Sequence, residues 1–173
     1  MGVDLAKRAL AAVKAIEDAG PDTLLPPSEV SAPKQQPVVP HSLFRDTRGY
    51  IEKVAFQING SYDATCYDAC AVMVRRLVEV LIIECFEAHG LAAKIKNSHG
   101  DFLYLADLIA ATLSEPAWNL GRNTKTGLGR LKTIGDQSAH SRRYNARREY
   151  IDEVLIDLRT VAEELLYLSK IKQ

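Results

Sequence analysis

Residues 151–168 read IDEVLIDLRTVAEELLYL, and this stretch decides the fold class. Its apolar residues recur every three or four positions, which is the spacing of one face of an α-helix. The residues of that face are Ile151, Val154, Leu155, Leu158, Val161, Ala162, Leu165 and Leu168. Acidic residues stand between them, so one side faces a core and the other faces water. We predict a long amphipathic C-terminal helix with Asn145 as its N-cap.

The same periodicity extends back through the chain. It predicts helices over residues 42–60, from residue 61 or 63 to residue 88, over 102–113 and around 128–135. The C-terminal half of the longest helix is apolar nearly all round, which is typical of a helix buried by its own bundle or by a second subunit. No alternation typical of β-strands extends over a useful length. The predicted fold class is all-α, an up-and-down helical bundle.

Proline usage divides the chain into parts. Six of the seven prolines lie between Gly20 and His41. Proline fixes φ and lacks a backbone donor, so this segment is predicted to be an extended linker. Residues 3–19 form a helical pattern with a mostly alanine apolar face, either an accessory helix or a partner-binding arm. We expect an accessory N-terminal helix at 1–19, a Pro-rich linker at 20–41 and the bundle at 42–173.

The composition is that of one globular domain without an overall charge preference. The chain has 173 residues, 47% of them hydrophobic, and its 22 basic residues balance 22 acidic ones. This length suffices for a single domain with a core. Because the net charge is zero, any preference for anions has to come from local clustering.

Cysteine and hydropathy patterns argue against metal, disulfide and membrane roles. The three cysteines, Cys66, Cys70 and Cys85, lie in one apolar helical pattern, and no second Cys or His pair at ligand spacing accompanies them. No apolar run approaches the roughly 20 residues that a membrane span needs, and the start lacks the apolar core of a secretory signal. We therefore expect a cytoplasmic protein with no metal, no cofactor and no membrane contact.

Positive charge is concentrated in residues 122–148. This segment holds eight basic residues and one acid, Asp136. Arg147 and Arg148 can be explained as a balance for the acidic helix that follows, but Arg142 and Arg143, which follow His140, cannot. Clustered arginines attract polyanions, and the planar guanidinium suits phosphate. We predict RNA or a nucleotide as the partner, with the phosphate contacts made by Arg142, Arg143, Arg130 and Arg122.

His140 lies inside this cluster. Positive neighbours disfavour a further charge on its ring, which leaves a neutral imidazole able to accept a proton. RNA carries its own nucleophile, the 2′-hydroxyl, so cleavage needs only a base and positive charge for the transition state. His140 with Lys132, Arg142 or Arg143 would meet that need without a metal. A histidine that is hydrogen-bonded for structural reasons is the alternative.

Two stretches resemble one known superfamily. Leu131–His140, LKTIGDQSAH, followed by a long amphipathic helix, resembles the signature end of HEPN-type helical domains. Tyr67–Glu79, YDACAVMVRRLVE, is similar to the first long helix of an uncharacterised bacterial branch of that superfamily. The resemblance implies a small helical bundle that commonly dimerises. Many such domains are metal-independent endoribonucleases of toxin–antitoxin and defence systems, and others are non-catalytic modules that bind nucleotides or RNA.

The resemblance also implies roles for single residues. Active members place an arginine, a polar residue such as asparagine, a short spacer and a histidine on one helix. His140 matches the histidine, Lys132 stands at the approximate place of the arginine, and Asp136 replaces the asparagine. His140 would be the general base, Asp136 its positioning partner, and Lys132 with Arg142 or Arg143 would hold phosphate.

Two functions remain open from the sequence. One is a HEPN-like endoribonuclease, a homodimer in which the two His140 side chains converge at the interface and which an antitoxin-like protein would bind. The other is a non-enzymatic module for dimerisation or interaction, with His140 in a structural role.

Overall fold

The computed structural model describes Ala11, Lys14 and residues 37–172. By its contacts the chain divides into a unit at residues 1–33 and a unit at residues 34–173. In the first unit Ala11 and Lys14 are helical. The rest of the predicted N-terminal helix and the predicted linker up to residue 36 lie outside the described residues.

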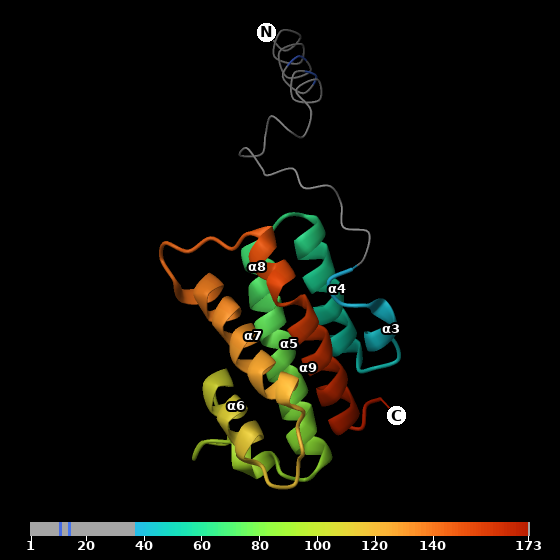
Figure 1. Ribbon diagram of the computed structural model, residues 1–173, viewed down its shortest axis with the longest axis vertical. Coiled ribbons are helices and arrows are strands. Elements are labelled where there is room, and N and C mark those ends of the chain that lie inside the picture. Colours follow the sequence, from blue (N-terminus) through green and yellow to red (C-terminus); the bar gives the residue numbers. More distant parts are fainter. Residues whose placement is uncertain (1–10, 12–13, 15–36, 173) are drawn as a thin grey trace, which may run out of the picture. The chain divides into compact units, whose positions relative to one another are not determined.

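The second unit is a helical bundle (Figure 1). Its elements are α3 (His41–Phe44), α4 (Gly49–Asp63), α5 (Tyr67–Ala88), the 3-10 helix η1 (Ala92–Ile95), α6 (Leu105–Ser114), α7 (Arg122–His140), α8 (Arg148–Glu153) and α9 (Leu155–Leu168). In the described part of the chain the β-structure amounts to one isolated antiparallel bridge between Lys96 and Phe102. The predicted all-α class is confirmed.

Helix α5 is the centre of the bundle. It packs against α4, α6, α7 and α9, and in Figure 1 it runs behind α7 and α9. Its inward residues have no exposed surface, among them Leu77, Leu81, Ile82, Cys85 and Phe86. Burial of this apolar area is the main favourable term that holds the bundle together. None of the helices that the structure describes is long and apolar enough to cross a membrane.

Two glycines of α7 let it approach its neighbours closely. A Cβ added at Gly135 would lie 2.4 Å from the Cβ of Arg75 and 3.1 Å from the carbonyl oxygen of Ala71, both on α5. A Cβ at Gly127 would lie 3.0 Å from Cγ2 of Val161 on α9. Each glycine weakens the isolated helix by about 1 kcal/mol relative to alanine. The close contacts explain why glycine nevertheless stands there.

The final amphipathic segment is not one helix. The predicted N-cap, Asn145, lies in the α7–α8 connection, and α8 instead begins after Arg147. The backbone N–H of Ala146 donates to Oδ1 of Asp68 at 3.0 Å, which holds this part of the connection on α5 and outside the helix. Val154, at φ −102° and ψ 3°, then separates α8 from α9.

The predicted linker ends earlier than expected. Val38 and Val39 are fully buried in the core of the bundle. The amide side chain of Asn59 on α4 accepts a hydrogen bond from Val39 N at 3.0 Å and donates one to Val39 O at 2.9 Å. A segment that buries two valines and satisfies its backbone on α4 belongs to the bundle, although two prolines flank it.

Earlier boundaries also shift. The predicted helix over 42–60 is divided into α3 and α4 around Asp46, whose φ is 65°. Helix α5 begins at Tyr67, and α6 begins at Leu105, after Phe102 has paired with Lys96. The periodicity therefore predicts which helices form better than it predicts where they start.

Gly135→Ala should destabilise the protein, since the new methyl group meets the Cβ of Arg75, which is fixed close to the α5 backbone. We expect the free energy of unfolding to fall by about 1–3 kcal/mol, measured by urea denaturation. Gly129→Ala is the matched control, because a Cβ there has no neighbour within 4 Å. That variant should gain up to about 1 kcal/mol, and equal losses in both variants would contradict the close-approach explanation.

Candidate functional site

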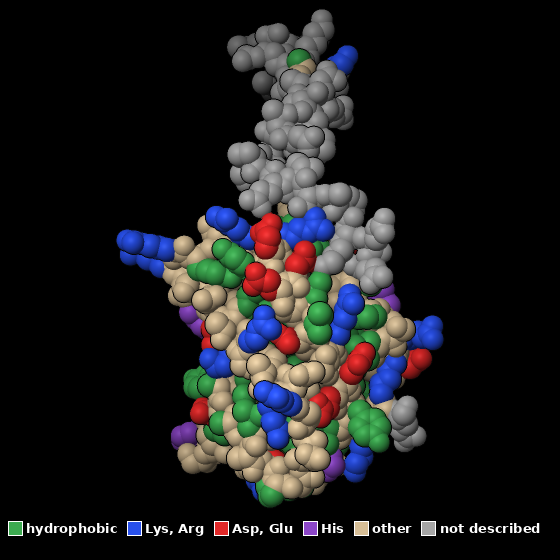
Figure 2. Space-filling model, in the orientation of Figure 1, with side chains coloured by type: hydrophobic (Ala, Val, Ile, Leu, Met, Phe, Trp, Pro, Cys, Tyr) green, Lys and Arg blue, Asp and Glu red, His purple; other side chains and the backbone are tan. Residues whose placement is uncertain are grey.

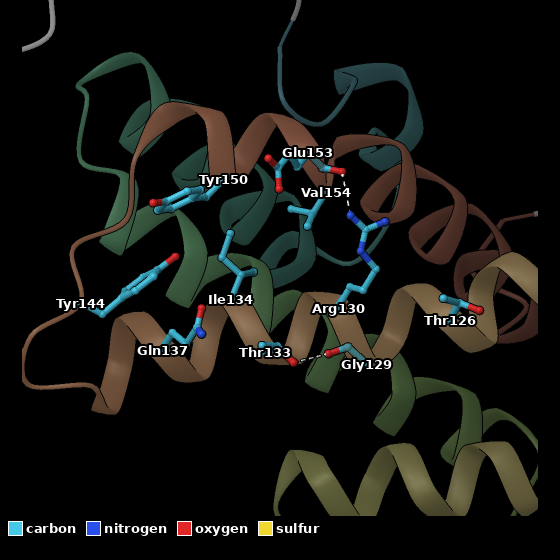
Figure 3. A pocket seen from close by; sticks show the side chains of 10 residues that line it. All are labelled: Thr126, Gly129, Arg130, Thr133, Ile134, Gln137, Tyr144, Tyr150, Glu153 and Val154. Atoms are coloured by element: carbon cyan, nitrogen blue, oxygen red, sulfur yellow. Dashed lines mark hydrogen bonds between the residues drawn. The ribbon is translucent and has the colours of Figure 1, made fainter.

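The outward face of α7 forms one wall of an open groove. Thr126, Arg130, Thr133 and Gln137 follow one another at spacings of four, three and four residues, so they share a helix face. The opposite wall comes from Tyr144 in the α7–α8 connection and from Tyr150, Glu153 and Val154 (Figure 3). The space between the walls is about 570 Å³. We call this space the α7 groove.

Two tyrosines form an aromatic wall at one end of the α7 groove. The rings of Tyr144 and Tyr150 stack, with centroids 5.9 Å apart and planes inclined by 23°. Tyr150 remains 37% exposed, so part of its ring is open to solvent. Burial, with a smaller contribution from Tyr150 and Asp68, raises the pKa of Tyr144. The phenol of Tyr144 therefore stays neutral near pH 7, where it can donate a hydrogen bond.

Anchors on α4 and α5 hold the aromatic wall in place. The hydroxyl of Tyr62 donates to Oδ1 of Asp152 at 2.6 Å and accepts a hydrogen bond from Nε of Arg148 at 2.9 Å. Burial and the hydrogen bond to Asp152 raise the pKa of Tyr62 to about 12. Together with the Asp68 bond to Ala146, these contacts fix both ends of the segment between the two tyrosines.

Arg130 lies on the wall farther along α7 and is partly neutralised. Its Nη1 is 2.7 Å from Oδ2 of Asp157 on α9, and its Nη2 donates to the backbone oxygen of Glu153 at 3.4 Å (Figure 3). Arg130 is thus the predicted phosphate ligand that lines the groove, but with its charge shared with α9.

The basic end of the site follows one turn beyond Gln137. His140 is the last residue of α7 and is exposed, as are Arg142 and Arg143 in the connection that follows. Within the part of the chain that the structure describes, none of the three side chains forms a hydrogen bond or an ion pair. Figure 2 shows Lys and Arg side chains protruding from the region of the α7–α8 connection. We call His140, Arg142 and Arg143 the basic end.

Lys132 and Asp136 lie beside the groove face of α7 and do not line the groove. Oδ1 of Asp136 accepts a hydrogen bond from Nε of Arg75 at 2.8 Å, and Oδ2 accepts one from Nζ of Lys132. Burial raises the pKa of Asp136, but the hydrogen bonds from Lys132 and Arg75 outweigh it and lower the pKa below its usual value. The bond from Arg75 ties α7 to α5, the bond from Lys132 stays within α7, and His140 takes part in neither.

The remaining predicted phosphate ligand is remote. Arg122 is the first residue of α7 and His140 the last of its 19 residues, a separation of roughly 27 Å along the helix. His140, Arg142 and Arg143 are thus exposed neighbours in the chain where α7 ends, Arg130 lines the groove, and Arg122 lies at the other end of α7.

The sequence reasoning missed the aromatic wall and the polar stripe. Thr126, Thr133 and Gln137 stand at helical spacing, and that signal was present in the sequence. The stack of Tyr144 on Tyr150 had no such signal, because it depends on how the intervening connection turns. In the described residues no group of three or more His, Cys, Asp or Glu side chains is placed to hold a metal ion.

Comparison with protein-family models, with curated proteins and with solved structures finds no match to this chain. The groove and the basic end are therefore interpreted from their own geometry and charge.

The Asp136 ion pairs predict a pH dependence of stability. Because the pKa of Asp136 is lowered by folding, its contribution is fully present above the unfolded value, near pH 4, and is lost as the pH falls through the folded value. Asp136→Asn should lower the free energy of unfolding by about 1 kcal/mol at neutral pH. The difference from wild type should shrink below about pH 4.

The matched control is Asp63→Asn, which changes an exposed carboxylate at the end of α4. Its stability profile should follow the wild type at all pH values. A constant difference between Asp136→Asn and wild type from acidic to neutral pH would contradict the role of the charge.

Proposed function

We propose that the α7 groove and its basic end bind single-stranded RNA. The observation that carries this proposal is that a stacked aromatic wall stands at one end of an open groove and that two exposed arginines directly precede Tyr144 of that wall in the chain. Single-stranded nucleic acids are held by aromatic side chains that stack on bases and by cations that follow the phosphates. The site offers both, and its arginines can bind phosphate through two donors at once.

Each part of the groove has a chemical use in this proposal. A base would stack on the exposed part of Tyr150, and Arg142 with Arg143 would hold the adjoining phosphates. Gln137 offers an amide to base edges or to a 2′-hydroxyl. The hydroxyl of Thr133 donates to the backbone oxygen of Gly129 at 2.8 Å and so remains available as an acceptor.

Metal-independent cleavage of the bound RNA is a second candidate function. The observation that favours it is the exposed His140 between the groove and the two arginines. The imidazole would take the proton of the 2′-hydroxyl, and the 2′-oxygen would form a bond to phosphorus while the bond from phosphorus to the 5′-oxygen breaks. The leaving oxygen takes a proton from water, which gives a 2′,3′-cyclic phosphate and a 5′-hydroxyl. Arg142 or Arg143 would stabilise the charge on the phosphate.

The resemblance of α5 and α7 to HEPN-type domains supports the same pair of functions, binding with or without cleavage. It would also give Asp136 and Lys132 a place in catalysis. The ion pairs of Asp136 with Lys132 and Arg75 favour binding as the primary function, since this carboxylate is then engaged elsewhere and does not orient His140. Participation in a toxin-type or defence system remains a prediction of the resemblance.

Binding is tested with a short fluorescein-labelled single-stranded RNA by fluorescence anisotropy. Tyr150→Ala should raise Kd by about tenfold, which corresponds to the loss of one base stack. The double change Arg142→Ala and Arg143→Ala should weaken binding and reduce its salt dependence. Tyr167→Ala is the matched control, because Tyr167 is 74% exposed on α9, away from the groove. Equal affinity in all variants would contradict the proposal.

Cleavage is tested by incubation of the same RNA with protein in excess EDTA, followed by gel analysis of the termini. His140→Ala should abolish cleavage and leave the affinity for RNA within about twofold. His99→Ala, which removes another exposed histidine, serves as control. If wild type and His140→Ala cleave equally, or neither cleaves, the catalytic function is excluded. RNA binding is decided separately, by the anisotropy measurement.

A further inference from the structure

One face of α5 is left uncovered by the bundle. Arg76, Val80, Ile83 and Glu87 stand at spacings of four, three and four residues and so form a single stripe along the helix. Arg76 and Glu87 are exposed, and Val80 and Ile83 are partly exposed although they also contact the core. Helices α4, α6, α7 and α9 pack on the other sides of α5. We call these four residues the α5 stripe.

Within the described residues neither Arg76 nor Glu87 forms a hydrogen bond or an ion pair. Their neighbour Arg75 differs, because it binds Asp136 at 2.8 Å and Glu79 at 3.4 Å. The stripe therefore presents a cation, two aliphatic side chains and an anion, in that order, to whatever lies outside.

This order is self-complementary. If a second α5 is laid antiparallel on the first, with the two-fold axis between positions 81 and 82, Arg76 meets the partner's Glu87 and Val80 meets the partner's Ile83. The same contacts then occur twice, as a two-fold interface requires. In a parallel arrangement like charges would face each other, which is unfavourable. We propose that a second copy of this chain docks on the α5 stripe and forms an antiparallel homodimer.

The composition of the stripe supports a copy of the chain over an unrelated partner. A partner helix has to present an anion, two aliphatic residues and a cation at matching spacing, and the chain itself carries such a helix. Two aliphatic residues on the outside also account for the near absence of a polar side in the C-terminal half of α5. Electrostatic complementarity of this kind fixes register and suppresses other pairings.

The arrangement has a consequence for the basic end. Gly135 packs against Ala71 and Arg75, so the C-terminal end of α7 lies beside the N-terminal part of α5. In an antiparallel α5 pair these N-terminal parts point in opposite directions. The two His140 side chains would then lie at opposite ends of the dimer, in contrast to the convergence that the resemblance to HEPN-type domains implies. Each subunit would carry its own groove, and the dimer does not depend on whether that groove binds RNA.

The test is charge reversal followed by sedimentation equilibrium of the full chain. Arg76→Glu and Glu87→Arg should each raise the dimer Kd by about tenfold or more, because like charges then face each other at both ends of the stripe. The double variant should recover the wild-type Kd. An equimolar mixture of the two single variants should also recover it, since their stripes are complementary to each other. Glu163→Arg, an exposed change on α9, is the control.

A distance measurement tests the register independently. Cys66 is exposed at the start of α5, whereas Cys70 and Cys85 are buried, so a spin label attaches selectively to Cys66. The proposed pairing separates the two labels by roughly 46 Å along the helix axes. A monomeric wild type, a dimer that single reversals leave intact, a double variant that stays weakened, or a much shorter label distance would each overturn the proposal.

Discussion

The contact of α7 with α5 at Gly135 is the constraint on which the rest of the structure depends. The missing side chain brings the α7 backbone against Ala71 and Arg75, and this proximity allows Asp136 to bind Arg75. Once the inner face of α7 is fixed in this way, its outer face has a fixed direction as well. Thr133, Gln137 and His140 follow on that outer face, so a tight helix contact determines where polar groups meet solvent.

A division of labour along α7 follows from this constraint. Asp136, which the sequence grouped with Lys132 and His140, binds Arg75 of α5 and Lys132 of its own helix, whereas Thr133 and Gln137 face the groove. Some charges of this cluster, such as Asp136, therefore stabilise the bundle, and others, such as Arg142 and Arg143, are exposed for a ligand. The sequence alone does not show this pairing, because Arg75 lies 61 positions before Asp136 in the chain.

The elements that local periodicity determines could be predicted from the sequence, and those that distant contacts determine could not. The apolar face of α9 and the middle of α7, around residues 128–135, follow from spacing alone, whereas α7 in fact extends from Arg122 to His140. The α7–α8 connection depends on Asp68, which lies 78 residues before Ala146, so Asn145 was wrongly assigned as an N-cap. The stack of Tyr144 on Tyr150 likewise depends on how Asp68 holds this connection. Likewise, the prolines beside Val38 and Val39 led to the prediction of a linker there. The burial of these valines depends on Asn59, whose side chain bonds the backbone of Val39.

The pairing of Asn59 with Val39 bears on the chemical ageing of the protein. Asn59 is followed by Gly60, a dipeptide whose asparagine deamidates readily in a flexible chain. In α4 the helical backbone restrains the attack of the Gly60 nitrogen on the side chain, and both atoms of the amide group are occupied by Val39. Deamidation would replace the donor nitrogen by a charged oxygen facing the Val39 carbonyl, in a buried site. If the chain stays unfolded long enough for Asn59 to deamidate, the change is irreversible. The refolded chain would then hold residues 37–39 less firmly.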